Sequence, residues 1–258
     1  MPQAHICQAV LGRVRKITGY PRISVLDLSC GDGQILHRVQ AEGCVCRGTH
    51  FRSDDYIFSG VRPADGIAID TGIDLLAALP YPDGEFDVVL MTEVLEHLER
   101  HDVAIREAAR VLRPNGHLIF TTPNIHRIHS RWQFFLAGAH KLIRRPVGWD
   151  VTLDDWYSYH VRPVDFPTLH TQLHLAEMAV SELCWTQCKW RHAAWILLYP
   201  LFLASILWHF RSRRSQSASF RRGRHDLRRW MWHPVTLASE QLMVVAIKSG
   251  LRGTSNNH

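Results

Sequence analysis

Apolar residues in the first half of the chain come in short runs that alternate with helical patterns. Five runs have the length and composition of strands, at residues 23–28, 43–51, 66–74, 86–91 and 117–123. Residues 33–41 predict a helix, and residues 101–116 place apolar side chains on one helical face until Pro114 and Gly116 end it. Strands that alternate with helices predict right-handed βαβ units and a parallel sheet covered on both faces.

The pattern changes after Pro123. Residues 124–162 are rich in Trp, His, Arg and Tyr without a clear period, which predicts a helical or irregular cap. A helix is expected at 163–176 and strands at 178–185 and 240–248. The predicted organisation is therefore a core at 1–125, a substrate cap and helix at 126–176, and a final unit at 177–258 that contains an insertion at 190–232.

The most apolar stretch, Trp195–Trp208, lies inside this insertion. Between residues 193 and 208 only Pro200 and Ser205 are not hydrophobic types, whereas a membrane span needs about twenty such residues. A single crossing would also leave the strand at 240–248 on the wrong side of the membrane. We therefore expect a hairpin, bent at Pro200, that docks on a membrane face. A dimerisation helix or a core helix is the alternative.

The distribution of charge and the cysteines indicate where in the cell the protein is located. The formal net charge is +6. The segment between Phe210 and Trp230 contains eight arginines and one acid, Asp226. Such a block suits an anionic membrane face, a nucleic acid or an acidic substrate. The six cysteines form no CxxC pair, which argues against a structural zinc site, and the first residues lack a signal-peptide core. We expect a cytoplasmic protein, peripheral on the inner membrane face.

The first chemical signal is a glycine turn directly after the first strand. Gly31 and Gly33 open the following helix, so a ligand can approach the backbone at the edge of the sheet. Leu36 interrupts the Gly-x-Gly-x-x-Gly pattern of dinucleotide-binding folds, and no Gly-Lys-Ser/Thr follows as in a P-loop. The turn therefore indicates a ligand of a different class.

The whole string "VLDLSCGDGQIL" resembles motif I of the class I S-adenosylmethionine-dependent methyltransferases. Two later strings resemble that family in the same order, "LPYPDGEFDVVLMTEVLEHLE" at 79–99 and "AARVLRPNGHLIFTTPN" at 108–124. The resemblance covers about residues 20–125 and implies a Rossmann-like α/β fold. Its sheet has seven mostly parallel strands in the order 3-2-1-4-5-7-6, with strand 7 antiparallel, and its activity is methyl transfer from S-adenosylmethionine.

The resemblance also implies a cofactor site. Asp27 ends the first strand, and the loop around the methionine part contains Ser29, where the family usually has glycine, with Gly31 and Gly33. His50 stands where the family has the acid that holds the ribose hydroxyls, so His50 takes that role unless Asp54 or Asp55 bends back.

Three further positions complete the cofactor site. Asp74 best fits the acid near the adenine amino group, with Asp70 as its rival, and Met91 and Glu93 are expected beside the sulfonium.

The string "EVLEHL" supplies candidate catalytic residues. Glu93, Glu96 and His97 lie on one face if the segment is helical, and two carboxylates with an imidazole suit a divalent cation such as Mg²⁺. The string resembles the metal-binding sequence of ubiquinone-pathway and small-RNA methyltransferases. The alternative is a helix start with Glu93 near the cofactor and a structural His97. Candidates for a further ligand are His126, His129 and His160, and His160 is also the first choice for a general base.

The acceptor is the least defined part of the prediction. The segment after the fifth strand resembles a bacterial subgroup linked to cell-surface glycans and lipid-linked sugars, so O-methylation of such an amphipathic small molecule is expected. Aromatic side chains of the cap could stack on a sugar or ring, namely Trp132, Trp149, Trp156, Tyr157 and Tyr159. The alternatives are a metal-dependent RNA 2′-O-methyltransferase and a non-catalytic partner protein. The sequence selects no oligomeric state.

Overall fold

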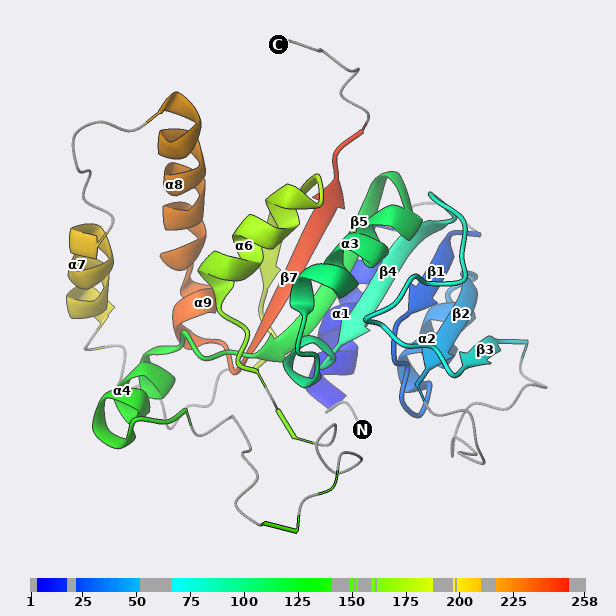
Figure 1. The fold of residues 1–258 in the computed structure, drawn as a ribbon, viewed down its shortest axis with the longest axis horizontal. Coiled ribbons are helices and arrows are strands. Elements are labelled where there is room, and N and C mark those ends of the chain that lie inside the picture. Colours follow the sequence, from blue (N-terminus) through cyan, green and yellow to red (C-terminus); the bar gives the residue numbers. More distant parts are fainter. Residues whose placement is uncertain are drawn as a thin grey trace.

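Seven strands form one sheet at the centre of the computed structural model (Figure 1). The strands are β1 (Ser24–Asp27), β2 (Val45–His50), β3 (Ala68–Thr71), β4 (Phe86–Thr92), β5 (Leu112–Pro123), β6 (Met178–Cys184) and β7 (Gln241–Lys248). The structure describes residues 4–17, 22–51, 66–140, 149–150, 152, 159–160, 162–187, 197, 199–209 and 217–250.

The strand order is β3-β2-β1-β4-β5-β7-β6. The first five strands pair in parallel, and β7 is antiparallel to both β5 and β6. The predicted α/β fold, its seven strands and its order are therefore confirmed. The division of the chain at residues 125 and 176 stays a prediction.

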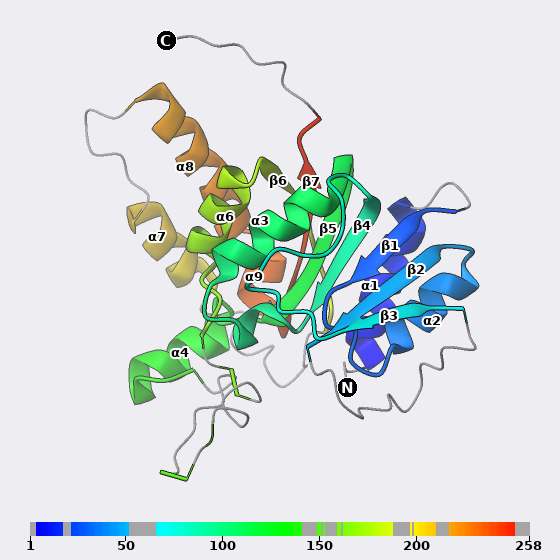
Figure 2. The ribbon, with the colours of Figure 1, turned by 45° about the vertical axis from the view of Figure 1, so that its right-hand side comes forward.

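Helices cover both faces of the sheet, as Figures 1 and 2 show. The helices are α1 (Ala4–Ile17), α2 (Gln34–Ala41), the 3₁₀ helix η2 (Leu95–His97), α3 (His101–Val111), α4 (Ile128–Ala137), α6 (Phe166–Leu175), α7 (Tyr199–His209), α8 (Ala218–Met231) and α9 (Pro234–Ala238). One core cluster joins α1 and α2 to the sheet, and the other joins α3, α6 and the α7–α9 region to the opposite face. Neighbouring residues such as Val25 and Leu26 point to opposite clusters, because side chains alternate along a strand.

Two predicted boundaries differ from the structure. The helix predicted at 101–116 ends at Val111, because Leu112 already pairs with Phe86 of β4. Pro114, which has no backbone N–H to continue a helix, lies in the first part of β5. The cap predicted at 124–162 contains α4, while Trp156 and Tyr157 lie outside the described residues.

The insertion between β6 and β7 folds as the helices α7, α8 and α9. Pro200 was expected to bend a hairpin, but it lies in the first turn of α7, where proline is tolerated because those N–H groups have no helical partner. The bend itself stays a prediction, because Trp195, Ile196 and Leu198 of the apolar stretch lie outside the described residues. Among the helices that the structure describes, none combines the length and apolarity that a membrane span requires.

The close packing of β2, β3, α2 and the turn after β1 rests on Gly48. A Cβ atom at this position would lie 2.6 Å from Ile69 Cδ1 and 2.8 Å from both Cys30 Sγ and Leu36 Cδ1. Gly48→Ala is expected to lower the free energy of unfolding by about 1–3 kcal/mol through overpacking. Urea denaturation followed by circular dichroism measures this loss.

Gly12 provides the matched control, since it lies inside α1 with no atom within 4 Å of an added Cβ. Gly12→Ala should raise the unfolding free energy by about 0.5–1 kcal/mol, because glycine weakens a helix interior. Equal effects of both substitutions would show that the packing at Gly48 is looser than described.

Candidate functional site

The glycine turn after β1 has a left-handed backbone at three alternate positions. Ser29, Gly31 and Gly33 have φ values of 65°, 57° and 69°. The Ser29 N–H donates to Thr49 Oγ1 at 3.0 Å, and the Cys30 N–H donates to the Thr49 carbonyl at 3.1 Å. These bonds hold the turn against β2 and keep a non-glycine residue, Ser29, in a conformation that favours glycine.

Open space lies beside the middle of this turn. A Cβ atom on Gly31 would meet nothing within 4 Å. Because the backbone of Gly31 faces this space at the carboxyl end of β1, a ligand can approach the main chain closely there.

Asp27, the last residue of β1, is a buried carboxyl group beneath the turn. Its Oδ1 has no hydrogen-bond partner among the described residues. Burial raises the pKa of Asp27 to about 8. A buried polar atom without a partner is unfavourable, so this position favours a donor that comes from a bound molecule.

His50 ends β2 as the sequence predicted. It pairs with Thr71 at the end of β3, and its carbonyl accepts from the Ile73 N–H at 3.0 Å. The imidazole therefore belongs to the same sheet edge as the glycine turn. Asp54 and Asp55, the alternatives for the ribose role, lie outside the described residues.

The two candidate acids near the adenine position differ in their contacts. Asp70 Oδ2 accepts from Arg47 Nε and from Tyr81 Oη, both at 2.6 Å. Burial alone would raise the pKa of Asp70, but these hydrogen bonds outweigh it and lower the pKa. Asp74 is exposed, and its Oδ1 accepts from the Leu76 N–H at 2.8 Å. Asp70 is thus engaged within the protein, which leaves Asp74 as the better candidate.

The end of β4 differs from the prediction in its backbone. Glu93 has a left-handed φ of 54°, and its N–H donates to the Thr121 carbonyl at 3.1 Å. Its carboxylate accepts from Thr121 Oγ1 at 3.0 Å. Burial raises the pKa of Glu93 to about 7, although the Thr121 bond opposes this. Met91 is fully buried in the hydrophobic core.

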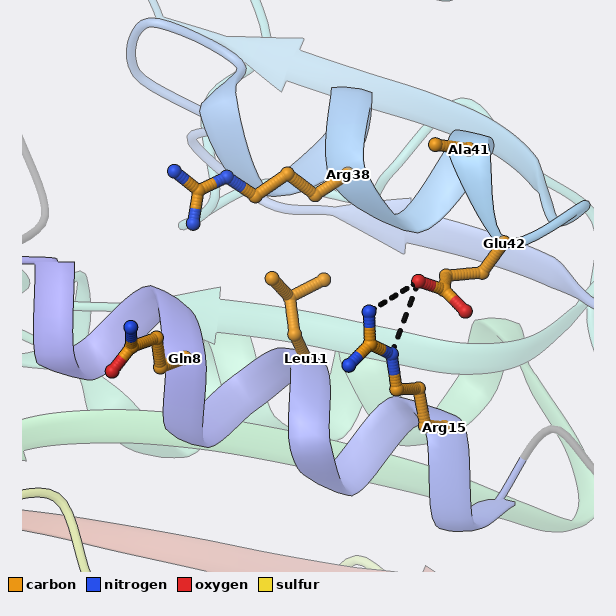
Figure 3. Close-up of a pocket in the computed structure, with 6 residues that line it drawn as sticks. All are labelled: Gln8, Leu11, Arg15, Arg38, Ala41 and Glu42. Carbon is orange, nitrogen blue, oxygen red and sulfur yellow. Dashed lines mark hydrogen bonds and ion pairs between the residues drawn. The ribbon is translucent and has the colours of Figure 1, made fainter.

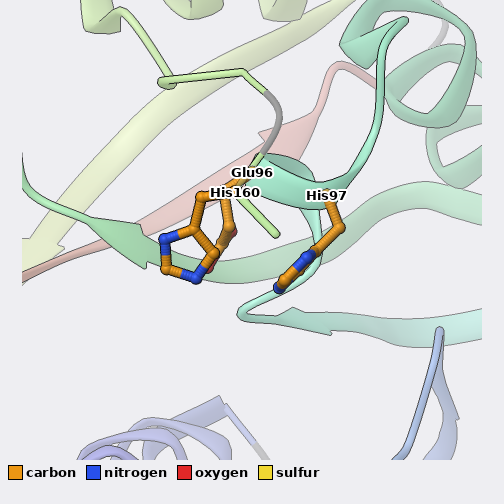
Figure 4. A group of neighbouring side chains, drawn as sticks. All are labelled: Glu96, His97 and His160. Atoms are coloured by element: carbon orange, nitrogen blue, oxygen red, sulfur yellow. The ribbon is translucent and has the colours of Figure 1, made fainter. Parts of the chain in front are cut away.

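Three side chains converge next to Glu93 (Figure 4). One potential ligand atom from each of Glu96, His97 and His160 lies within 4.8 Å of the other two. The rings of His97 and His160 are 5.0 Å apart at 80°. His97 Nδ1 lies 2.9 Å from the Tyr159 carbonyl, so this nitrogen donates and Nε2 is the basic one.

Glu96 is the most buried member of this group, at 1% exposure. Among the described residues, no donor makes a hydrogen bond of normal distance and angle to either carboxylate oxygen. Burial, reinforced by the nearby Glu93 charge, raises the pKa of Glu96 well above its ordinary value. Two carboxylate oxygens beside two imidazoles form a donor set that fits a divalent cation.

The predicted metal set therefore needs revision. The segment 93–98 is not an α-helix, since its one helical part is the 3₁₀ turn Leu95–His97. Glu93 precedes that turn, and its carboxylate accepts a hydrogen bond from Thr121. His160, not Glu93, joins Glu96 and His97. His126 is engaged elsewhere, since its Nε2 accepts from the Phe166 N–H at 2.9 Å, and His129 on α4 is not part of the group.

The sequence did not single out Thr121 or Tyr159 for the roles they have here. Thr121 anchors Glu93, and the Tyr159 carbonyl orients His97. Thr121 had a recognisable signal, because it is a small polar residue near the carboxyl end of a strand adjacent to β4. No local pattern identifies a backbone carbonyl as the partner of a distant histidine.

A separate groove of about 420 Å³ lies between α1 and α2 (Figure 3). Its lining includes Gln8, Leu11, Arg38 and the ion pair of Arg15 with Glu42 at 2.5 Å. It contains none of the candidate residues at the sheet edge, so the chemistry described above belongs elsewhere.

Comparison with known proteins agrees with this geometry. A family model described as "Methyltransferase domain" matches residues 26–120. The chain contains a class I methyltransferase domain. S-adenosylmethionine is the cofactor of this family, and the matched residues include the glycine turn and the Glu93–His97 segment.

Curated relatives include methyltransferases that act on different atoms. The domain is 32% identical to an ajmaline N-methyltransferase of Rauvolfia serpentina, over 48% of this chain and 44% of that protein. It is 29% identical to a ubiquinone biosynthesis O-methyltransferase of Vibrio campbellii, over 62% of this chain and 66% of that protein. The chain thus spans about half to two thirds of the length of these relatives.

Among solved structures, a SAM-dependent methyltransferase from Archaeoglobus fulgidus superposes with a TM-score of 0.53. It is 17% identical and covers 94% of each chain, which shows the shared fold.

The buried carboxyl group of Asp27 makes the stability of the ligand-free methyltransferase domain depend on pH. With a folded-state pKa of about 8, the folded chain keeps a proton that the unfolded chain loses near pH 4. Wild-type stability is therefore expected to fall between pH 4 and 8, by up to about 1.4 kcal/mol per pH unit. Asp27→Asn cannot ionise, so its advantage over the wild type should grow with pH in urea denaturation.

Asp150→Asn is the matched control, because it removes an exposed carboxyl group in place of a buried one. A constant difference between Asp27→Asn and the wild type from pH 4 to 8 would contradict the buried, protonated state of Asp27.

Proposed function

We propose that this protein transfers the methyl group of S-adenosylmethionine to an oxygen of a small amphipathic or lipid-linked acceptor. The observation that supports it most is the glycine turn, which has open space beside Gly31 and the buried, unpartnered Oδ1 of Asp27 beneath it. The match of residues 26–120 to the methyltransferase domain includes this turn and supports the proposal.

The turn and strand ends hold the cofactor in this proposal. The backbone of Ser29, Gly31 and Gly33 encloses the methionine part, with Asp27 below it as an acceptor for a cofactor donor. His50 binds one ribose hydroxyl in place of the usual acid. A single imidazole nitrogen replaces two carboxylate oxygens, so we expect weaker ribose binding than with an acid.

The far end of the site holds the adenine and the reacting centre. Asp74 accepts from the adenine amino group, and the Met91–Glu93 backbone lies beside the sulfonium. S-adenosylmethionine supplies a methyl group on a good, charged leaving group. The protein has to align the acceptor oxygen with this methyl group and exclude water. Glu93, which is half-buried and accepts a hydrogen bond from Thr121, suits this positioning role.

We further propose that Glu96, His97 and His160 hold a divalent cation such as Mg²⁺ at the acceptor side. The buried carboxylate of Glu96 and the oriented Nε2 of His97 support this set. A bound cation supplies Lewis acidity that lowers the pKa of an acceptor hydroxyl. An oxygen acceptor benefits from this activation more than an amine, which needs only a free lone pair. If no cation binds, His160 is the candidate general base.

The surroundings of the site support an amphipathic acceptor. Apolar side chains of Pro123, Ile125 and Val164 pack around Glu96 and His160. Helix α4, which follows β5 closely, exposes aromatic side chains such as Trp132 and Phe135. A small polar head with an apolar remainder fits these surroundings best.

Binding of S-adenosylhomocysteine tests the cofactor site. The wild type should gain thermal stability with this ligand, and calorimetry should give a dissociation constant. Gly31→Arg should weaken binding by more than about tenfold, which corresponds to about 1.4 kcal/mol, because its side chain enters the space that the ligand needs. Gly43→Arg is the control, since Gly43 also has positive φ and open space but lies outside the site. No thermal shift in the wild type would count against the proposed function.

Mn²⁺ provides a spectroscopic probe of the proposed cation site. Titration followed by electron paramagnetic resonance should show one bound ion, with affinity reduced about tenfold to a hundredfold in His160→Ala or Glu96→Gln. His129→Ala should leave the affinity unchanged, because His129 is not part of the group. Methyl transfer that survives EDTA would reject the cation and favour His160 as the base.

A further inference from the structure

Two helices on the acceptor side expose large apolar side chains to solvent. On α4, Phe135 and Leu136 are 77% and 67% exposed, and Phe134 is 49% exposed. On α7, Leu201 and Trp208 are 65% and 76% exposed. Single exposed apolar residues are common on soluble proteins, but clusters of this kind usually mark an interaction surface.

The orientation of α7 is fixed by its other face. Ile206 is buried against the core, Phe202 and Leu203 pack on it, and Tyr199 Oη donates to the Trp232 carbonyl at 3.3 Å. Leu201 and Trp208 are seven residues apart and share the opposite face, as the 3.6-residue repeat requires. The outer apolar face of α7 is therefore not needed for the core of this chain.

The two exposed clusters lie on neighbouring helices. The Arg131 guanidinium of α4 lies 5.8 Å from the centre of the Phe202 ring of α7. Figures 1 and 2 both place α4, α7 and α8 at the same end of the molecule, away from β3. We call the outer faces of these three helices the docking surface.

Helix α8 makes the docking surface strongly basic. It contains Arg221, Arg222, Arg224, Arg228 and Arg229. Its one acid, Asp226, lies 2.8 Å from His170 Nε2. Helices α4 and α7 contain no acid at all. The docking surface thus combines apolar side chains with a cluster of arginines, and the one carboxylate of its helices, Asp226, is paired with His170.

This combination selects among possible partners. A second copy of the chain that used the same faces would bring arginine clusters together, which is unfavourable. A nucleic acid would satisfy the arginines but leave Leu201 and Phe135 in water. An anionic lipid bilayer satisfies both, because its headgroups attract arginines and its interior accepts apolar side chains.

We propose that the docking surface binds the face of an anionic lipid bilayer, with α4 and α7 inserted at the headgroup boundary and α8 over the phosphates. Since α4 follows β5 closely, docking holds Glu96 and His160 near the lipid. The consequence that the acceptor comes from the membrane rests on the proposed function. The docking itself does not.

Vesicle flotation without any cofactor tests the docking. The full chain should float with vesicles of phosphatidylcholine and phosphatidylglycerol, and much less with phosphatidylcholine alone. Arg221→Gln with Arg222→Gln should weaken binding roughly 25-fold, because about fivefold is lost per basic residue near an anionic surface. Phe135→Gln with Trp208→Gln should weaken it by about tenfold or more, because two apolar side chains no longer insert.

The groove between α1 and α2 offers a matched control. Arg15→Gln with Arg38→Gln removes two arginines of α1 and α2, away from α4, α7 and α8, and should leave flotation unchanged. Thermal stabilisation by S-adenosylhomocysteine should be the same in all variants, which shows that they are folded and separates a failed docking from a failed methyltransferase.

Two results would overturn the docking proposal. The first is that the wild type does not float with anionic vesicles, or floats equally well when the docking surface is altered. The second is a dimer in light scattering that Phe135→Gln with Trp208→Gln dissociates, which would make the surface a contact between copies of the chain.

Discussion

The carboxyl ends of β1, β2, β4 and β5 meet at one edge of the sheet, and the candidate site depends on how the chain leaves that edge. After β1 and after β4 the backbone turns through left-handed conformations, at Ser29 and at Glu93. Each turn is held by a threonine of a neighbouring strand, Thr49 of β2 in one case and Thr121 of β5 in the other. Because both threonines lie in the rigid sheet, both turns are fixed before a ligand binds. Such preorganised turns favour the alignment of two reactants.

Most of the fold could be predicted from sequence because parallel strands are buried on both faces. Strands such as residues 86–91 are therefore apolar throughout and can be recognised in the sequence. The order of the strands in the sheet was predicted from the resemblance of the motif around Gly31 to a known family. Helix α1 was missed, although Ile6, Val10 and Val14 repeat at helical spacing and are buried. The end of α3 was misplaced because strand pairing at Leu112, a long-range contact, overrides the local helical pattern.

The candidate site could be predicted only in part, and the reasons are geometric. Glu96 and His97 were singled out by their spacing, but spacing assumes a helix, and the left-handed Glu93 breaks it. His160 was one of three candidate histidines, and only folding brings it within 4.8 Å of Glu96 and His97. The first-turn position of Pro200 likewise depends on where α7 begins, which packing of Tyr199 and Ile206 decides. Local patterns identify the chemistry, whereas tertiary contacts decide which groups meet.

We propose, as the central claim, that the protein transfers methyl groups at this fixed sheet edge to an acceptor that comes from a lipid surface. Incubation of the protein with methyl-tritiated S-adenosylmethionine and extracted bacterial membrane lipids, followed by solvent partition, tests this most directly. We predict that label enters the organic phase in proportion to enzyme and time, and that it stays at background when the lipids are omitted. Label that appears only in water-soluble small molecules or in RNA, or in no fraction at all, would contradict the account.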